Sequence, residues 1–159
     1  PRYPLSRTDP MSAALSAKTA EENQILKNGI DRDWIDENGD KVDNGVWVAA
    51  DGNVTYTWKK PVTISGARMI FDSEFIYRGK RMRKLEGTME RKDMPKMLAK
   101  TFKIEACDKK GRWTTVYEED NNILRLRKVS FAPVQAKSLR LTVTAWGGDK
   151  AHVFAFDAL

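Results

Sequence analysis

Four aromatic residues lie in turn-rich or polar stretches where their rings could stack on a sugar: Trp34, Trp47, Tyr77 and Trp146. An aromatic ring offers a large apolar face, which suits a ligand with one apolar face and hydroxyl groups at its edges. Trp34 follows an aspartate and Trp146 precedes two glycines, so both positions favour exposure. Trp47 can equally well plug one end of a hydrophobic core. We take all four as predicted ligand-binding residues.

Oxygen-bearing side chains recur at short intervals at Asp36, Asn38 and Asp40, with Asp43 close behind. Calcium prefers several oxygen ligands at such spacing, and backbone carbonyls would complete its shell. The run is not an EF-hand, because its glycine stands at the fourth position and no glutamate occupies the twelfth. An ion-free turn is the alternative, since Asp, Asn and Gly also favour turns. Calcium is the only metal that the sequence suggests.

Catalytic groups are scarce in this chain. It has one histidine, His152, and one cysteine, Cys107, so neither a zinc site nor a histidine-assisted nucleophile is readily assembled. Glycine-rich dinucleotide-binding and phosphate-binding loops are both missing from the sequence. We therefore assign no catalytic residue and no cofactor to this segment. His152 and Cys107 both stand in strand-like runs, which favours a hydrogen-bonded structural histidine and a small apolar cysteine.

The formal net charge of +6 is local rather than general. Residues 77–103 hold ten Lys or Arg against three acidic residues, and the densest part is 78–84. Such a stretch could attract phosphates or an acidic glycan, or it could be a solvated loop. Only one aromatic residue lies between Phe75 and Phe102, whereas proteins that bind single strands interleave stacking rings with positive charge. The sequence therefore argues against a nucleic-acid partner.

The elements that must position these residues are strands. Apolar and polar residues alternate through several short runs, most clearly at 138–146 and 151–157. A period of two is what a strand with one buried face requires. We expect an all-β fold, a jelly-roll β-sandwich of about eight antiparallel strands with a short N-terminal helix. By the same alternation, Trp58 and Trp113 are predicted to lie in the core.

The order of elements follows from turn signals along the 159 residues. Residues 1–11 read as a linker or N-terminal arm, and 12–159 as one domain. An edge strand is predicted at 13–19, and a helix of one or two turns at 20–29 is closed by Gly29. Later strands are predicted at the following ranges: 53–58 and 62–71, paired as a hairpin, then 101–107, 113–117, 123–131, 138–146 and 152–157. Turns are expected at 109–111 and 147–148.

The sequence says little about the compartment in which the protein is found and more about its relation to membranes. A single cysteine excludes an internal disulfide, and no apolar run approaches the length needed to cross a bilayer, so no membrane insertion is expected. The chain begins at Pro1 and can be a fragment or a processed product. The localisation stays unknown, with a periplasmic or secreted parent protein as one option.

The order of several short motifs resembles the galactose-binding-like, discoidin-type family over residues 13–159. The motifs occupy the following residues: 27–32, 45–49, 58–64, 67–73, 113–116, 121–122, 131–134 and 138–143. More narrowly, the Phe-Asp-Ser strand, residues 93–96 and residues 100–105 are similar to the C-terminal domain of bacterial FAD-dependent oxidoreductases. The resemblance implies a jelly roll whose loops hold a sugar or another partner, in some relatives with calcium beside the first loop. It places any FAD chemistry in an upstream domain, and the long basic segment 77–92 departs from the family pattern.

Two functions remain open from the sequence. The first is a non-catalytic binding module for carbohydrate, in which the four aromatic residues stack on the ligand. The second is a structural C-terminal domain that packs against the upstream catalytic domain of an FAD-dependent oxidoreductase. An aromatic rim at one end of the sandwich would favour the first, and a large apolar patch on one face would favour the second.

Overall fold

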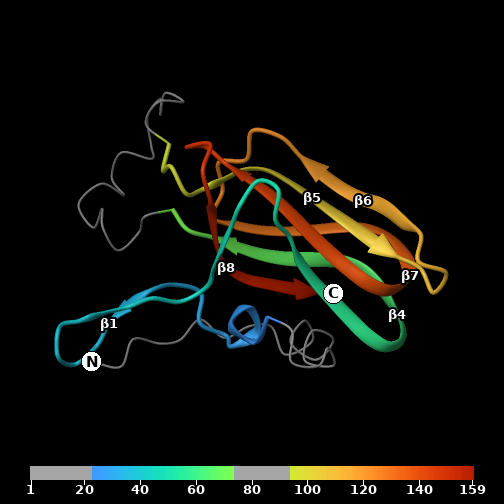
Figure 1. Ribbon diagram of the computed structural model, residues 1–159, viewed down its shortest axis with the longest axis horizontal. Coiled ribbons are helices and arrows are strands. Elements are labelled where there is room, and N and C mark those ends of the chain that lie inside the picture. The colour runs from blue at the N-terminus through green and yellow to red at the C-terminus, as the bar shows by residue number, and fades with distance from the viewer. Residues whose placement is uncertain (1–22, 74–93) are drawn as a thin grey trace.

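The computed structural model describes residues 23–73 and 94–159, which form a β-sandwich (Figure 1). Several predictions concern residues outside the described ranges: the arm at 1–11, the domain boundary at residue 12, the edge strand at 13–19, Tyr77 and the basic segment 77–92. The predicted helix at 20–29 is described in part. Within the described part, no helix is long and apolar enough to span a membrane.

The described elements are one short 3-10 helix and eight strands: η1 (Gln24–Lys27), β1 (Trp34–Ile35), β2 (Lys41–Val42), β3 (Val46–Val48), β4 (Val54–Phe71), β5 (Ala99–Cys107), β6 (Trp113–Glu119), β7 (Leu126–Ala145) and β8 (Ala151–Ala158). β1 and β2 form a small hairpin, and the other six pair in the order β3-β8-β4-β7-β5-β6. All recorded pairings are antiparallel, as the sequence predicts.

The two longest strands, β4 and β7, bend and so belong to both layers of the sandwich. Their mutual pairing shifts register between Thr57 and Val62 and again between Ile64 and Gly66, which marks the bend. The first half of β4 and the second half of β7 lie with β5 and β6 in what we call the β5–β6 layer. The other halves lie with β8 and β3 in the β8 layer.

This bending corrects two predictions from the sequence. Residues 53–58 and 62–71 do not pair with each other as a hairpin, because they are successive parts of one strand that each pair with β7. Likewise, 123–131 and 138–146 are not separate strands, since β7 runs through both. The Lys59-Lys-Pro61 turn signal marks a bend with a register shift rather than a chain reversal.

Aromatic rings from the two layers meet in the core. Tyr56 stacks on Phe156 with ring centroids 5.1 Å apart, and its hydroxyl donates to the Phe156 carbonyl at 2.7 Å. On the other side of the core, Phe71 lies 5.5 Å from Phe102. Trp58 is 2% exposed, so its predicted place in the core is confirmed.

Trp113 was predicted to lie in the core, and that prediction is wrong. Its side chain is 38% exposed, because β6 is an edge strand and Trp113 begins it. The guanidinium of Arg140 lies 3.9 Å from the ring centroid, on the outer side of the β5–β6 layer. Alternation of apolar and polar residues does not show which face of an edge strand is buried when its outer face also carries a large apolar side chain.

β8 is buried on both faces, although its alternation predicted burial of one face only. All eight of its residues are buried, including the polar His152 and Asp157. Its inner face packs in the core. On its outer face, chain that precedes β4 contacts the strand, through Arg68, which bridges Asp157 and Asp31, and through the Asn44 carbonyl at His152. A register shift between Ile70 and Phe71, opposite Phe154, allows extra side chains to face outward.

The short N-terminal helix is present in reduced form. The predicted helix at 20–29 appears as η1, a single 3-10 turn at Gln24–Lys27, and Leu26 anchors it in the core. Gly29 follows with a φ of 76°, the left-handed conformation that its position predicted. The predicted turn at 109–111 is also present, with a backbone hydrogen bond from Gly111 to Asp108 at 3.1 Å.

Candidate functional site

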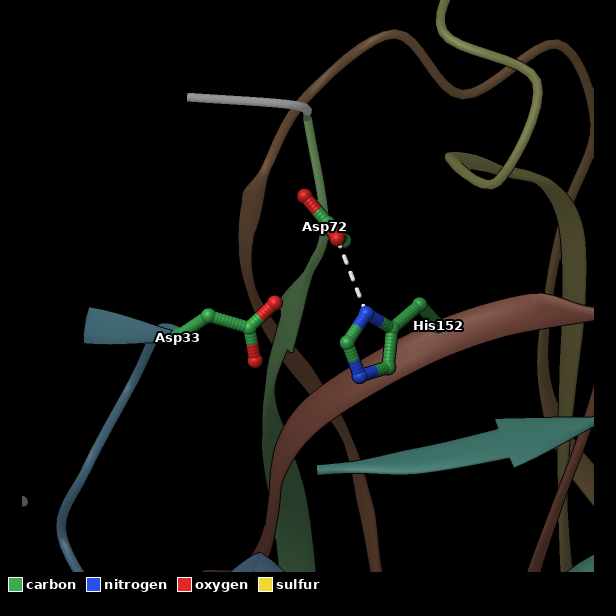
Figure 2. A group of neighbouring side chains, drawn as sticks. All are labelled: Asp33, Asp72 and His152. Atoms are coloured by element: carbon green, nitrogen blue, oxygen red, sulfur yellow. Dashed lines mark hydrogen bonds and ion pairs between the residues drawn. The ribbon is translucent and has the colours of Figure 1, made fainter. Parts of the chain in front are cut away.

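Four buried polar side chains and the partly exposed Trp47 gather under the chain that covers β8. We call them the His152 cluster, and Figure 2 shows Asp33, Asp72 and His152. Its members come from five places: Asp33 before β1, Asn44 before β3, Trp47 on β3, Asp72 directly after β4 and His152 on β8. Trp47 and His152 are register partners in the antiparallel pair of β3 and β8. The fold thus brings together residues that are more than a hundred positions apart.

Both ring nitrogens of His152 have partners. Nδ1 lies 2.8 Å from Oδ2 of Asp72, and Nε2 lies 2.6 Å from the backbone carbonyl oxygen of Asn44. A carbonyl only accepts, so Nε2 carries a proton and donates it. Nδ1 is joined to Asp72 by the other hydrogen bond, so the imidazole is held from both sides in a site where His152 is 1% exposed.

Asp33 and Asn44 hold the covering chain above this pair. The backbone N–H of Asn44 donates to Oδ1 of Asp33 at 2.6 Å, and Nζ of Lys41 lies 3.3 Å from Oδ2 of Asp33. The side chain of Asn44 donates to the Ile30 carbonyl at 2.5 Å and accepts from Asn28 at 2.9 Å. Buried polar groups are costly unless paired, so these contacts determine the path of residues 28–44.

Gly45 brings the covering chain into direct contact with β8. Its φ of 76° lies in the left-handed region, which side chains rarely adopt. A Cβ at this position would collide with the Val153 carbonyl oxygen and would lie 3.1 Å from Nε2 of His152. Only glycine fits both the conformation and the space here.

A second group of charges fixes the same covering chain further along β8. Arg68 donates to Asp31 at 2.7 Å and to Asp157 at 3.0 Å, and all three side chains are mostly buried. Arg125 donates to the Asp31 carbonyl and lies 5.3 Å from the ring of Phe154. Burial lowers the pKa of Arg125, while nearby carboxylates act in the opposite direction. These ion pairs are structural, because they join the cover to the sheet.

Trp47 is the member of the cluster that reaches the surface. Its ring stacks on the imidazole of His152, with centroids 4.1 Å apart and planes within 8° of parallel. The side chain is nevertheless 49% exposed. One face of the indole is thus held against a fixed, buried ring while much of the remaining surface stays accessible. This arrangement suits stacking against a ligand.

The other predicted ligand-binding residues are not gathered around Trp47. Trp34 is half-buried in β1, and Tyr77 lies outside the described residues. Trp146 is half-buried against the core, donates its indole N–H to the Asn122 carbonyl at 2.7 Å, and has Nζ of Lys100 5.3 Å from its ring centroid. Across residues 23–73 and 94–159, no ring contact joins Trp34, Trp47 and Trp146.

The predicted calcium motif forms the turn between β1 and β2. Oδ1 of Asp36 accepts the backbone N–H groups of Asn38 and Asp40, both at 2.9 Å, and the Asp36 N–H donates to the Asp40 carbonyl. The spacing of these residues therefore satisfies backbone donors within the turn. Calcium at Asp36, Asn38 and Asp40 stays a prediction, and one carboxylate oxygen of the set is already engaged.

Asp33, Asp72 and His152 are the one group of His, Cys, Asp and Glu side chains in the described residues whose donor atoms converge, all within 4.8 Å. Such a donor set can bind a divalent cation. Here, however, Asp33 already binds Lys41 and the Asn44 N–H, and Asp72 is hydrogen-bonded to His152. The polar groups of the cluster thus bind one another, and they form a fixed hydrogen-bonded support beneath Trp47.

Sequence reasoning missed this cluster because its members look ordinary one by one. His152 was predicted to be a hydrogen-bonded structural histidine, and its burial with two partners confirms that prediction. The buried Cys107 is likewise consistent with a small apolar role. The available signal was a carboxylate immediately after an apolar strand, at Asp72, and a lone histidine in an apolar one. Neither signal identifies its partner.

Comparisons with known proteins support the fold. No family model matches the chain, and no curated protein matches it. A family 32 carbohydrate-binding module from Streptococcus pneumoniae EndoD superposes with a TM-score of 0.51 at 18% identity, over 70% of this chain and 70% of that one. A two-domain protein of unknown function from Bacteroides fragilis gives 0.54 at 15% identity, over 74% of this chain and 35% of that one.

The chain therefore has a galactose-binding-like, discoidin-type β-sandwich fold, as its motifs suggested. At such low identity the likeness concerns the fold alone. The chain corresponds to about a third of the Bacteroides fragilis protein. The narrower resemblance to the C-terminal domain of FAD-dependent oxidoreductases stays a prediction.

Proposed function

We propose that this chain is a non-catalytic carbohydrate-binding module, with Trp47 as its central ligand-binding residue. The observation that carries the proposal is the half-exposed indole stacked on a buried imidazole. The fold supports it, because the Streptococcus pneumoniae neighbour is itself a carbohydrate-binding module. Proteins of one fold bind different ligands, so the proposal depends on the geometry of the Trp47 site.

The His152 cluster makes Trp47 a rigid platform. His152 is fixed at both nitrogens, by Asp72 and by the Asn44 carbonyl, so the ring beneath the indole has little freedom. A side chain that is already ordered loses less conformational entropy when a ligand binds. The apolar face of a sugar ring would lie on the open face of the indole, and its hydroxyl groups would face water and the polar chain near Asn44.

The remaining candidates from the sequence are proposed separately from the Trp47 site. We propose Trp34, Tyr77 and Trp146 as further ligand-binding residues. Trp146 would contribute its ring rather than its N–H, which the Asn122 carbonyl already accepts. Calcium at the β1–β2 turn is retained as a proposed structural ion, with Asp36, Asn38 and Asp40 as ligands.

The test is a glycan array probed with the whole chain, with and without calcium, followed by titration of the best neutral ligand. Trp47→Ala should abolish or strongly weaken binding while leaving the fold intact. Trp113→Ala is the matched control, because it removes another partly exposed indole from an edge strand on the other layer. Equal losses in both variants would show that Trp47 is not the binding residue.

Silence of the folded protein across the array would contradict the proposal. The alternative would then gain weight, namely a structural C-terminal domain that packs against the upstream catalytic domain of an FAD-dependent oxidoreductase. Co-purification of the two parts from the full-length parent would test that alternative directly.

A further inference from the structure

The opposite end of the sandwich carries a hollow of about 360 Å³ between the bend of β4, the β5–β6 turn and the bend of β7. We call it the basic hollow, and it is lined by Pro61, Asp108, Lys109, Lys110, Arg112 and Gln135. These three segments meet at the right of Figure 1, away from the β1–β2 hairpin. The strands that flank these segments are paired next to them: Thr57 with Ser138, Ser138 with Cys107, and Cys107 with Trp113. The three segments therefore lie side by side.

Positive charge dominates this end. The three segments, residues 58–63, 108–112 and 133–138, contain five lysines and one arginine but a single carboxylate. The lysines are Lys59, Lys60, Lys109, Lys110 and Lys137. The carboxylate, Asp108, is bound by Arg112 at 2.8 Å. Four of the lysines are exposed and form no ion pair with another described residue: Lys59, Lys60, Lys109 and Lys110.

The turn that presents Lys109 and Lys110 is held in one conformation. Oδ1 of Asp108 accepts the backbone N–H of Lys110 at 2.8 Å and that of Arg112 at 3.1 Å. Gly111 supplies the left-handed residue, with a φ of 84°. On the neighbouring segments, Gln135 donates to Thr63 at 2.6 Å and Lys137 donates to the Lys59 carbonyl at 2.5 Å. The cations therefore project from an ordered surface.

We propose that the basic hollow is a second binding site, for a linear polysaccharide that carries carboxylate or sulfate groups. Adjacent strands are about 4.8 Å apart, so the cations of the β4 bend, the β7 bend and the β5–β6 turn form a row roughly 10 Å long. An extended polymer with repeated anionic groups matches such a row better than a single small anion does. The site goes beyond the proposed Trp47 site, since it lies at the other end of the sandwich.

The chemistry of the hollow favours an acidic polysaccharide over nucleic acid. Proteins that bind single-stranded nucleic acid combine basic grooves with stacking rings. The nearest exposed ring in the described residues, Trp113, has one side occupied by Arg140 at 3.9 Å. Five of the six cations are lysines, which act as point charges and lack the planar fork with which arginine grips phosphate.

The test is titration of the whole chain with heparin and polygalacturonate as sulfated and carboxylated probes, with dextran as the neutral probe and single-stranded DNA as the competing class. Lys109→Ala/Lys110→Ala should weaken binding of at least one acidic polysaccharide by about tenfold at low salt, and raised salt should weaken the wild type. The control is Lys96→Ala/Lys150→Ala, which removes the same charge from two exposed lysines near the other end. It should change the affinity less than about twofold.

Several outcomes would overturn the proposal. If both double variants weaken the binding of acidic polysaccharide equally, the binding depends on the net charge of the chain and not on the basic hollow. Loss in Arg81→Ala/Arg83→Ala/Lys84→Ala, with unchanged binding in Lys109→Ala/Lys110→Ala, would assign the binding to the basic segment 77–92 instead. Tighter binding of DNA than of either acidic polysaccharide would assign the hollow to nucleic acid.

Trp47→Ala separates this proposal from the proposed function. If that variant loses the neutral glycan and keeps the acidic polysaccharide, the two sites are independent, as we expect. If it loses both, one site binds both ligands and the second site does not exist. If wild type binds an acidic polysaccharide but no neutral glycan, and Lys109→Ala/Lys110→Ala loses it, the basic hollow stands while the Trp47 proposal fails.

Discussion

The two outer faces of the sandwich differ in what their polar residues do. On the β8 layer, residues 28–47 cover the sheet and bury polar side chains such as Asp72, His152 and Asp157. On the β5–β6 layer, the outer face is open, and its polar pairs lie at the surface, for example Thr101 with Thr144 and Arg140 with Glu105. The same all-β framework thus has one face that depends on buried ion pairs and another that does not.

The difference shows where stability and where binding reside. Breaking a buried ion pair leaves the other charge without water or a partner, which costs several times more than breaking an exposed pair. Substitutions under the cover should therefore lower the free energy of unfolding by several kcal/mol, whereas substitutions on the open face should lower it by about 2 kcal/mol or less. The following predictions test this contrast, from the largest expected effect to the smallest.

His152→Ala should have the largest effect. It leaves the carboxylate of Asp72 and the carbonyl of Asn44 buried without their partner, and it removes the support under Trp47. We expect a loss of about 3–5 kcal/mol in the free energy of unfolding, measured by urea denaturation. A loss below about 1 kcal/mol would mean that the cover opens easily and that the two faces are not so different.

Gly45→Ala should come next, with a loss of about 3 kcal/mol in unfolding free energy from backbone strain and collision with β8. Gly111→Ala is the matched control, because Gly111 has a similar φ of 84° and open space around its Cβ position. That control should cost only about 1 kcal/mol. Equal losses would show that the collision relaxes and that the cover is not tightly fitted.

The sequence predicts the features that neighbouring residues determine, and it does not predict those that depend on contacts between distant segments. The alternation in β5, the turn at 109–111, Gly29 and the core position of Trp58 are local features, and each was predicted correctly. The cover is non-local, since the contact of Asp33 and Asn44 with Asp72 and His152 depends on where three separate segments meet.

Two further errors have the same origin. A turn signal at Lys59-Lys-Pro61 predicts a change of direction, but whether the strand reverses or merely bends is decided by its partner β7. Similarly, the burial of both faces of β8 depends on a cover that its own alternation does not contain. Among the aromatic residues, exposure at Trp47 and Trp113 follows from edge positions in the sheet, which turn signals alone do not define.

Acid should expose the contribution of the surface pairs. A hydrogen bond from Arg140 lowers the pKa of Glu105, and one from Arg127 lowers the pKa of Glu119. Because the folded-state pKa values lie below the unfolded ones, the stabilisation is complete above the unfolded-state pKa and is lost as pH falls through the folded-state values, below about pH 4. Glu105→Gln/Glu119→Gln should be less stable at pH 7 by about 1–2 kcal/mol and should lose less on acidification.

Glu118→Gln is the control for this experiment, because Glu118 is exposed on the same strand as Glu119. Its unfolding free energy at pH 7 should stay close to that of the wild type, because an exposed charge contributes little to stability. If the double variant has the same pH dependence as the wild type, the acid response arises elsewhere and the surface pairs contribute nothing measurable.

Arg140→Ala should have the smallest effect on stability, about 0.5–1 kcal/mol, although Arg140 makes two contacts. It loses the 2.9 Å bond to Glu105 and its position over the Trp113 ring, both on the outer face of the β5–β6 layer, where the pair is partly exposed. The pKa of Glu105 should rise toward its ordinary value, since its main stabilising partner is gone. Tryptophan fluorescence should shift to the red as Trp113 becomes more hydrated, and the midpoint of urea denaturation should fall by a few tenths of a molar at most, about as that loss requires. A loss comparable to that of His152→Ala would remove the distinction between the two faces, because it would make a partly exposed pair as important as a buried one.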